Sequence, residues 1–108
     1  MSKESERVMS SSLTIDDKPV IITVASELKP YKPASETYTL EELQAAVGGY
    51  IQLITLANNY RMVIDEEGKI KSKPINLQAT LLAHECGAIF PNDVINGDAL
   101  VCRDELID

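Results

Sequence analysis

The 108-residue sequence contains no tryptophan, one phenylalanine, one histidine and two cysteines. Because aromatic residues are so few, we expect an aliphatic core, for which a hydrophobic content of 44% is ordinary globular usage. No apolar run approaches the ~18 residues that a membrane-spanning helix needs, and the N-terminus lacks the apolar stretch of a secretory signal. We therefore expect a soluble cytoplasmic protein with no membrane contact, in which Cys86 and Cys102 are reduced thiols.

Basic residues are also scarce, since ten lysines and arginines stand against seventeen acidic residues and give a formal net charge of −7. This balance argues against a broad basic surface, so no direct contact with nucleic acid is predicted. Two interpretations of the acidity stay open. A negative surface keeps a small protein in solution, or it mimics nucleic acid and occupies a DNA-binding partner. The absence of a long acidic run favours the first interpretation.

Residues 1–18 are rich in serine and charge, so we expect a flexible N-terminal arm followed by a single domain over residues 19–108. The domain begins with the β-branched apolar run 19–25, which predicts an interior strand. Residues 26–38 contain two prolines and are predicted to form a linker.

The sequence after this linker predicts a helix followed by a β-hairpin. Thr39 and Glu42 have the spacing of a capping box, which marks the start of the helix. Gly48 suits the left-handed residue that ends one. Strands are expected over residues 50–56 and 61–65, and they are joined by a loop with two asparagines, which tolerate positive φ.

A second helix is expected from Leu77 to about Ala83, with Asn76 as its N-cap, and a last strand over residues 99–102. The element order is then β-α-β-β-α-β. This order predicts an α+β fold in which two short helices pack against a single, mostly antiparallel sheet.

The stretch around His84 and Cys86 is the one that most suggests chemistry. A cysteine nucleophile needs a base within hydrogen-bond reach, but residues two apart on a helix point in different directions. A zinc site would have to combine this pair with Cys102 and a carboxylate, without the usual paired cysteine spacing. Packing explains these side chains better, so no catalytic residue, metal or cofactor is predicted.

Four short motifs carry a resemblance to a known family. They are Val47, Gly48, Gly49, Tyr50 and Ile51; Glu66, Glu67, Gly68 and Lys69; Pro74 and Asn76; and Gly97 and Asp98. Over roughly residues 38–102, the sequence resembles a family of small uncharacterised proteins, a domain of unknown function, from bacteriophages and mobile elements. Asp65 stands where this family more often has asparagine. The resemblance implies a shared fold and transfers no activity.

Two functions fit these observations best. The preferred one is a non-enzymatic accessory protein of a phage or mobile element that binds a host protein, such as a defence factor. The alternative is a protein that binds a small nucleotide-like metabolite, in a pocket lined by Tyr50, Tyr60, Gly48 and Gly49. A hydrolase or metal protein that uses His84 is the weakest hypothesis.

Overall fold

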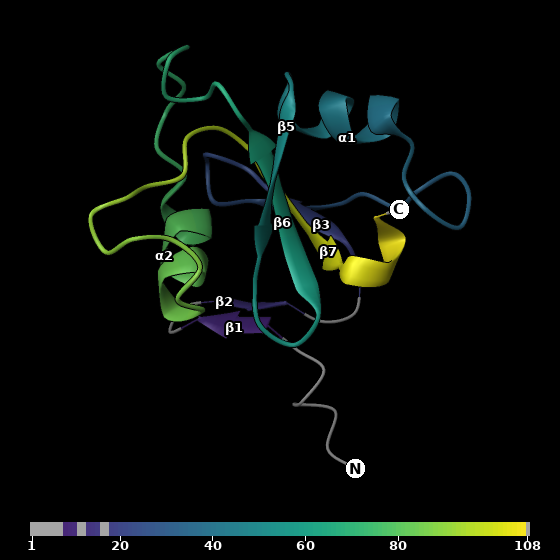
Figure 1. Cartoon of the computed structure of the whole chain (residues 1–108), viewed down its shortest axis with the longest axis horizontal. Helices are drawn as coiled ribbons and strands as arrows, with labels where there is room; N and C mark the ends of the chain where they lie inside the picture. The colour runs from purple at the N-terminus through teal and green to yellow at the C-terminus, as the bar shows by residue number, and fades with distance from the viewer. Residues whose placement is uncertain (1–7, 11–12, 16–17, 108) are drawn as a thin grey trace.

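The computed structural model describes residues 8–10, 13–15 and 18–107, and its main body is one sheet with two helices (Figure 1). The strands of this sheet are β3 (Val20–Ile22), β4 (Leu28–Pro30), β5 (Ile51–Thr55), β6 (Tyr60–Asp65) and β7 (Ala99–Arg103). The helices are α1 (Leu40–Val47) and α2 (Leu77–Glu85), and a short 3-10 helix (Asp104–Leu106) follows β7. All neighbouring strands of the sheet are antiparallel. The predicted α+β fold is confirmed.

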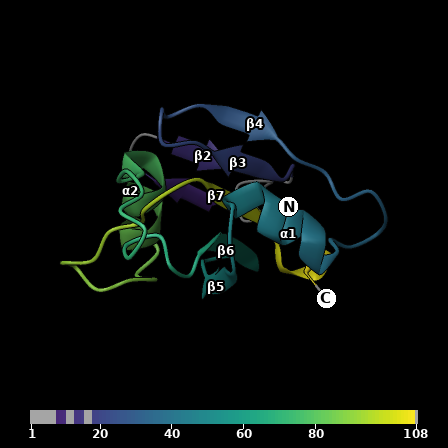
Figure 2. The same cartoon turned by 90° about the horizontal axis from the view of Figure 1, so that it is seen from above.

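The strand order is β4-β3-β7-β6-β5, so β4 and β5 form the two edges of the sheet. Figure 2 shows this order from above, with β4 at one side of the molecule and β5 at the other. The first predicted strand is interior as expected, because β3 lies between β4 and β7. It is shorter than predicted, since only Val20–Ile22 pairs.

The two helices pack on opposite faces of the sheet, because side chains alternate along each strand. Met62 and Ile64 of β6 pack with Leu82 of α2. Val63, between them, packs on the other face with Leu43 of α1. The core therefore has two apolar layers, and both are mostly aliphatic as the sequence predicted.

The local signals for α1 and the hairpin are confirmed. Thr39 and Glu42 form the capping box, in which each side chain accepts a hydrogen bond from the other residue's backbone N–H. Gly48 ends the helix in the left-handed region, with φ of 78°. Asn58 and Asn59 turn the β5–β6 hairpin with φ of 58° and 65°.

The predicted linker is wrong in part, because residues 26–38 contain the edge strand β4. Val20 pairs with Pro30 and Ile22 with Leu28. A proline interrupts an interior strand but is tolerated on an edge, where its missing N–H has no neighbour to bond. Pro30 is therefore compatible with an edge strand, whereas Pro33 lies beyond it.

The N-terminal arm contains two short strands that were not predicted. Val8–Ser10 (β1) and Leu13–Ile15 (β2) pair in a separate antiparallel sheet, and β1 lies beside α2 (Figure 1). Residues 1–7, 11, 12, 16 and 17 lie outside the described residues, so the flexibility expected for residues 1–18 stays a prediction.

Candidate functional site

The buried carboxylate of Asp65 lies at the centre of the motif residues. Its side chain is 0% exposed at the end of β6, and Oδ2 is 2.9 Å from the Lys71 ammonium and 2.7 Å from the Lys73 ammonium. The other oxygen, Oδ1, accepts the Glu67 backbone N–H at 2.8 Å. Three donors therefore hold one buried carboxylate. We call Asp65, Lys71 and Lys73 the Asp65 clasp.

The clasp also holds the C-terminal end of α1. Lys73 Nζ donates to the carbonyl of Val47 at 2.7 Å, and Lys71 Nζ lies 3.5 Å from the carbonyl of Gly48. The last carbonyls of a helix lack intrahelical partners and carry partial negative charge, so a cation there is stabilising. Since α1 has no basic residue in its last turn, the lysines of the following loop supply that charge.

The motif glycines are needed because other groups approach their backbone closely. A Cβ on Gly49 would lie 2.5 Å from Lys71 Nζ and 2.8 Å from both Asp65 oxygens. One on Gly97 would lie 2.9 Å from Lys73 Cδ, and one on Gly68 would lie 2.6 Å from a backbone carbonyl oxygen. Side chains at these positions would displace the clasp or the loop beside it.

The remaining motif residues tie the same region to the sheet. The buried side chain of Asn76 accepts the Ala79 N–H as the predicted N-cap of α2. Its amide also donates to the carbonyls of Ile22 at 2.8 Å and Gly97 at 2.9 Å. The four motifs therefore converge on one hydrogen-bonded frame. Their first role is to fix the fold.

The pKa of Asp65 makes part of the stability sensitive to acid. Burial raises this pKa, but hydrogen bonds from Lys73, Lys71 and the Glu67 N–H outweigh burial and lower it from 3.8 to about 2. A carboxyl with a lowered pKa stabilises the folded state above its unfolded pKa, and this contribution is lost as the pH falls towards the folded value.

We expect Asp65 to contribute on the order of 2 kcal/mol to the free energy of unfolding at neutral pH, lost between about pH 4 and pH 2. Urea unfolding at several pH values measures this loss. Other carboxylates titrate in the same range, so Asp65→Asn is the control, and the difference between the two proteins should shrink as the pH falls. A difference independent of pH would contradict the assignment.

Gly49→Ala is expected to lower the free energy of unfolding by about 1–3 kcal/mol, because the new methyl group pushes the clasp apart. Gly87→Ala is the matched control, since a Cβ there meets nothing within 4 Å and only its φ of 66° is unfavourable. Thermal unfolding of both variants compares the two costs. Equal losses would show that the clasp does not depend on close approach at Gly49.

The four residues predicted to contact a ligand do not share one pocket. Gly49 and Tyr50 line a hollow of about 200 Å³ together with Gln44, Glu67 and Lys71. Gly48 is the residue before Gly49 in the chain and is not among the residues that line the hollow. Tyr60, in contrast, is 0% exposed in the core, and the guanidinium of Arg103 lies 5.4 Å from its ring centroid. The predicted contacts of Gly48, Gly49 and Tyr50 stay predictions, and Tyr60 lies apart from them.

The two cysteines lie in different parts of the core, and His84 contacts the backbone. His84 Nε2 lies 2.8 Å from the backbone carbonyl oxygen of Asp93. Cys86 packs on the α2 face of the sheet, whereas Cys102 is buried on the α1 face, where burial raises its pKa to about 12. Among the residues that the structure describes, no three His, Cys, Asp or Glu side chains are placed to hold a metal ion.

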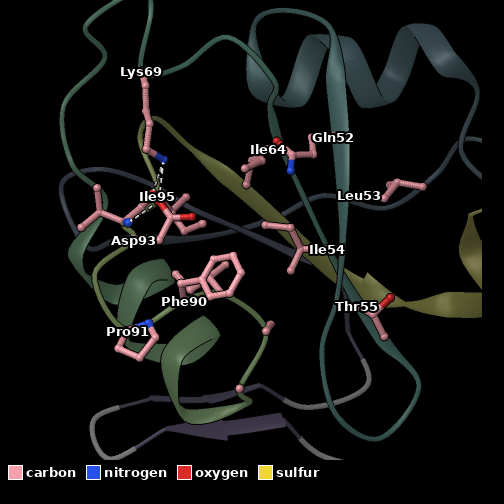
Figure 3. A pocket seen from close by; sticks show the side chains of 14 residues that line it. Gln52, Leu53, Ile54, Thr55, Ile64, Lys69, Phe90, Pro91, Asp93 and Ile95 are labelled. Atoms are coloured by element: carbon pink, nitrogen blue, oxygen red, sulfur yellow. Dashed lines mark hydrogen bonds and ion pairs between the residues drawn. The ribbon is translucent and has the colours of Figure 1, made fainter.

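A larger groove of about 600 Å³ runs between β5 and the segment 87–95 that follows α2 (Figure 3). Its lining is mainly apolar and includes Ile54, Ile64, Ile95, Pro91 and the highly exposed Phe90. Gln52 and Ile54 project from β5 towards the side where Phe90 lies, whereas Leu53 points away (Figure 3).

One wall of this groove is fixed by Lys69, which is 2.9 Å from Asp93 Oδ1 and donates to the Val94 carbonyl at 2.7 Å (Figure 3). The groove was not predicted from the sequence. The available signal was a lone phenylalanine in a polar turn with proline, where no core residue is expected. Phe90 is 78% exposed and is the most prominent apolar side chain of the groove.

The comparisons with known proteins identify a family and no activity. No curated protein and no solved structure matches the chain significantly. Within the described residues, no helix has the length and apolar character that a membrane span requires. Residues 17–106, which contain the five-stranded sheet, both helices and the clasp, match the family described as Domain of unknown function (DUF3846). The chain therefore belongs to the DUF3846 family.

Proposed function

We propose that this chain is a non-enzymatic protein that acts by binding a protein partner in the groove beside β5. The position of Phe90 is the observation that carries this proposal, because this aromatic side chain is 78% exposed beside a groove with many apolar residues and gains free energy when a partner covers it. Aromatic anchors that insert between partners supply much of the binding energy of protein interfaces.

The chemistry of the buried and half-buried titratable groups supports a function without catalysis. Asp65, whose pKa is lowered to about 2, is held by three donors and closed to solvent. Cys102 is buried, and its raised pKa keeps it a thiol. His84 contacts a backbone carbonyl rather than a nucleophile. Asp65 and Cys102 are therefore inaccessible to a substrate.

A host protein is the partner class that we favour. The resemblance of the four motifs to proteins of phages and mobile elements points to a host target, such as a defence factor. The net charge of −7 favours a target with a basic surface, which would make association faster at low salt.

Binding of a nucleotide-like metabolite is the second candidate, and the hollow at Gly49 and Tyr50 would be its site. This hollow measures about 200 Å³, below the ~300 Å³ at which small-molecule pockets usually begin. The ammonium of Lys71 on its wall is already bonded to Asp65. A rise in the melting temperature with added nucleotides would support this candidate.

Capture from a bacterial host lysate tests the protein-binding function. Purified wild type, Phe90→Ser and Leu40→Ser are immobilised in parallel, since Leu40 is an equally apolar, 55% exposed residue of α1 on the opposite face. We expect one protein in stoichiometric amount on the wild type and on Leu40→Ser, but not on Phe90→Ser. Equal capture by all three proteins, or stoichiometric capture by none, would refute the proposal.

A further inference from the structure

We infer that the partner binds as an additional β-strand on the outer edge of β5, with apolar side chains at alternate positions entering the groove. This inference rests on the proposed function, because it specifies how the protein partner is held. It depends on three features of β5, namely its unpaired backbone groups, its lack of protective residues and its position beside the groove.

Along β5, the backbone N–H and C=O groups of alternate residues point towards β6 or outward from the edge of the sheet. In antiparallel pairs, residues that face each other exchange hydrogen bonds at every second position. Just outside β5, the Leu56 N–H donates to the Tyr60 carbonyl at 2.9 Å, and the Glu66 N–H donates to the Tyr50 carbonyl at 2.8 Å. With the observed register, the even-numbered residues of β5 are therefore the ones that bond to β6.

The odd-numbered residues Ile51, Leu53 and Thr55 consequently direct their N–H and C=O groups outward from the sheet. Among the described residues, no further strand pairs with β5. These groups form a row with the spacing that an incoming strand requires, and main-chain bonds of this kind give affinity when an edge strand binds a peptide.

The two edges of the sheet differ in how they are protected. Lysine and proline are residues that block pairing at exposed edges. The edge strand β4 is only three residues long and contains Lys29 and Pro30. The edge strand β5 has five residues, Ile-Gln-Leu-Ile-Thr, with no charge and no proline. Only the edge next to the groove is therefore open to pairing.

The groove determines which kind of side chain the added strand needs at alternate positions. Gln52 and Ile54 project on the groove side of β5 (Figure 3). In a strand paired with β5, alternate side chains project on this same side and reach the space of about 600 Å³ beside Phe90. Apolar side chains at these positions match the apolar lining.

Charge favours a different protein over a second copy of this chain. Each copy carries a net charge of −7, so pairing of two β5 edges would bring two acidic molecules together. Glu66 is exposed and lines a smaller hollow that shares Gln52 and Lys69 with the groove, so it adds negative charge next to the groove. The occupant is therefore an extended segment with apolar residues at alternate positions and basic residues at its ends.

The test uses a mixture of ten-residue peptides with Val, Ile, Leu or Phe at alternate positions, Thr or Ser between them, and two lysines at each end. Amide hydrogen exchange of each β5 residue is measured by NMR with and without the mixture. At a concentration about ten times the dissociation constant, we expect exchange at Leu53 and Thr55 to slow about 10-fold. Gln52 and Ile54 are already bonded to β6, so they exchange slowly without peptide and slow further only through the added stability of the complex. The discriminating result is new protection at Leu53 and Thr55, whose amides are not bonded to β6.

Leu53→Pro and Leu53→Ala are the paired variants. Proline removes an outward N–H without breaking a bond to β6, whereas alanine keeps the N–H and removes the side chain. We expect Leu53→Pro to abolish the slowing at Thr55 and Leu53→Ala to retain it. If Leu53→Pro fails to fold, the pattern of exchange in the wild type decides alone.

Three results would overturn the inference. They are no binding of the mixture, binding without slower exchange at Leu53 and Thr55, and slower exchange that depends on protein concentration in the absence of peptide. The last would identify a second copy as the occupant. Capture of one partner by the wild type and by Leu53→Pro, with loss on Phe90→Ser, would leave the protein-binding function standing and remove only the added strand.

Discussion

Replacing Asp65 with alanine is expected to lower the free energy of unfolding by about 3 kcal/mol. The carboxylate accepts hydrogen bonds from two ammonium groups and one backbone amide, and its side chain is closed to solvent. Removal of one partner from a buried ion pair typically costs ~3–5 kcal/mol. Because Lys71 and Lys73 retain some exposure, they can regain water, and we expect the lower end of this range. Urea unfolding at neutral pH measures the loss.

Asp104→Ala is the matched control for this prediction. Asp104 also forms an ion pair, with Arg61 at 3.1 Å, but its side chain is 51% exposed. Exposed pairs typically contribute less than ~1 kcal/mol. A loss at Asp65 no greater than that at Asp104 would show that the clasp is not a central stabilising element of the fold.

Truncation of Phe90 to alanine is expected to weaken partner binding by at least about 30-fold, which corresponds to about 2 kcal/mol. Truncation to alanine removes the whole aromatic ring, and with it the contacts that the ring makes with the partner in the complex. The same change should leave the free energy of unfolding within about 0.5 kcal/mol of the wild type, because the side chain is 78% exposed. Calorimetric titration with the purified captured partner measures the affinity.

Leu40→Ala serves as the control for Phe90, since it removes an exposed apolar side chain from α1 on the opposite face of the sheet. Its affinity for the partner should match that of the wild type. An equal loss of affinity in both variants, or none in Phe90→Ala, would place the binding surface outside the groove.

Local sequence signals predicted the elements that depend on neighbouring residues. The capping box of Thr39 and Glu42, the left-handed Gly48 and the Asn76 cap act within one or two turns of the chain. Their energetics do not require distant partners, so the sequence pattern was sufficient.

The Asp65 clasp could not be predicted in this way, because the spacing of its members has no helical or strand period. Lys71 and Lys73 lie in a loop, and their positions depend on the end of α1, more than twenty residues earlier in the chain. The motif glycines were visible in the sequence. Gly49 and Gly97 have to be glycine because lysine side chains lie close to their backbone, and this is visible only in the three-dimensional structure.

The groove and the open edge depend on strand order, which the sequence left undetermined. β7, the last strand, lies between β3 and β6 and thereby places β5 at an edge. Phe90 comes from a segment more than thirty residues after β5, and only the packing of α2 brings that segment beside it (Figure 3). Both features are products of long-range packing.

Hydrogen–deuterium exchange of the complex with the captured partner, read by mass spectrometry, locates the binding surface on the protein. We expect slower exchange in residues 51–55 and 87–95 on binding, and no change in residues 40–47 of α1. Slower exchange confined to α1, to β4 or to the hollow at Gly49 and Tyr50 would contradict the assignment of the groove beside β5 as the binding surface.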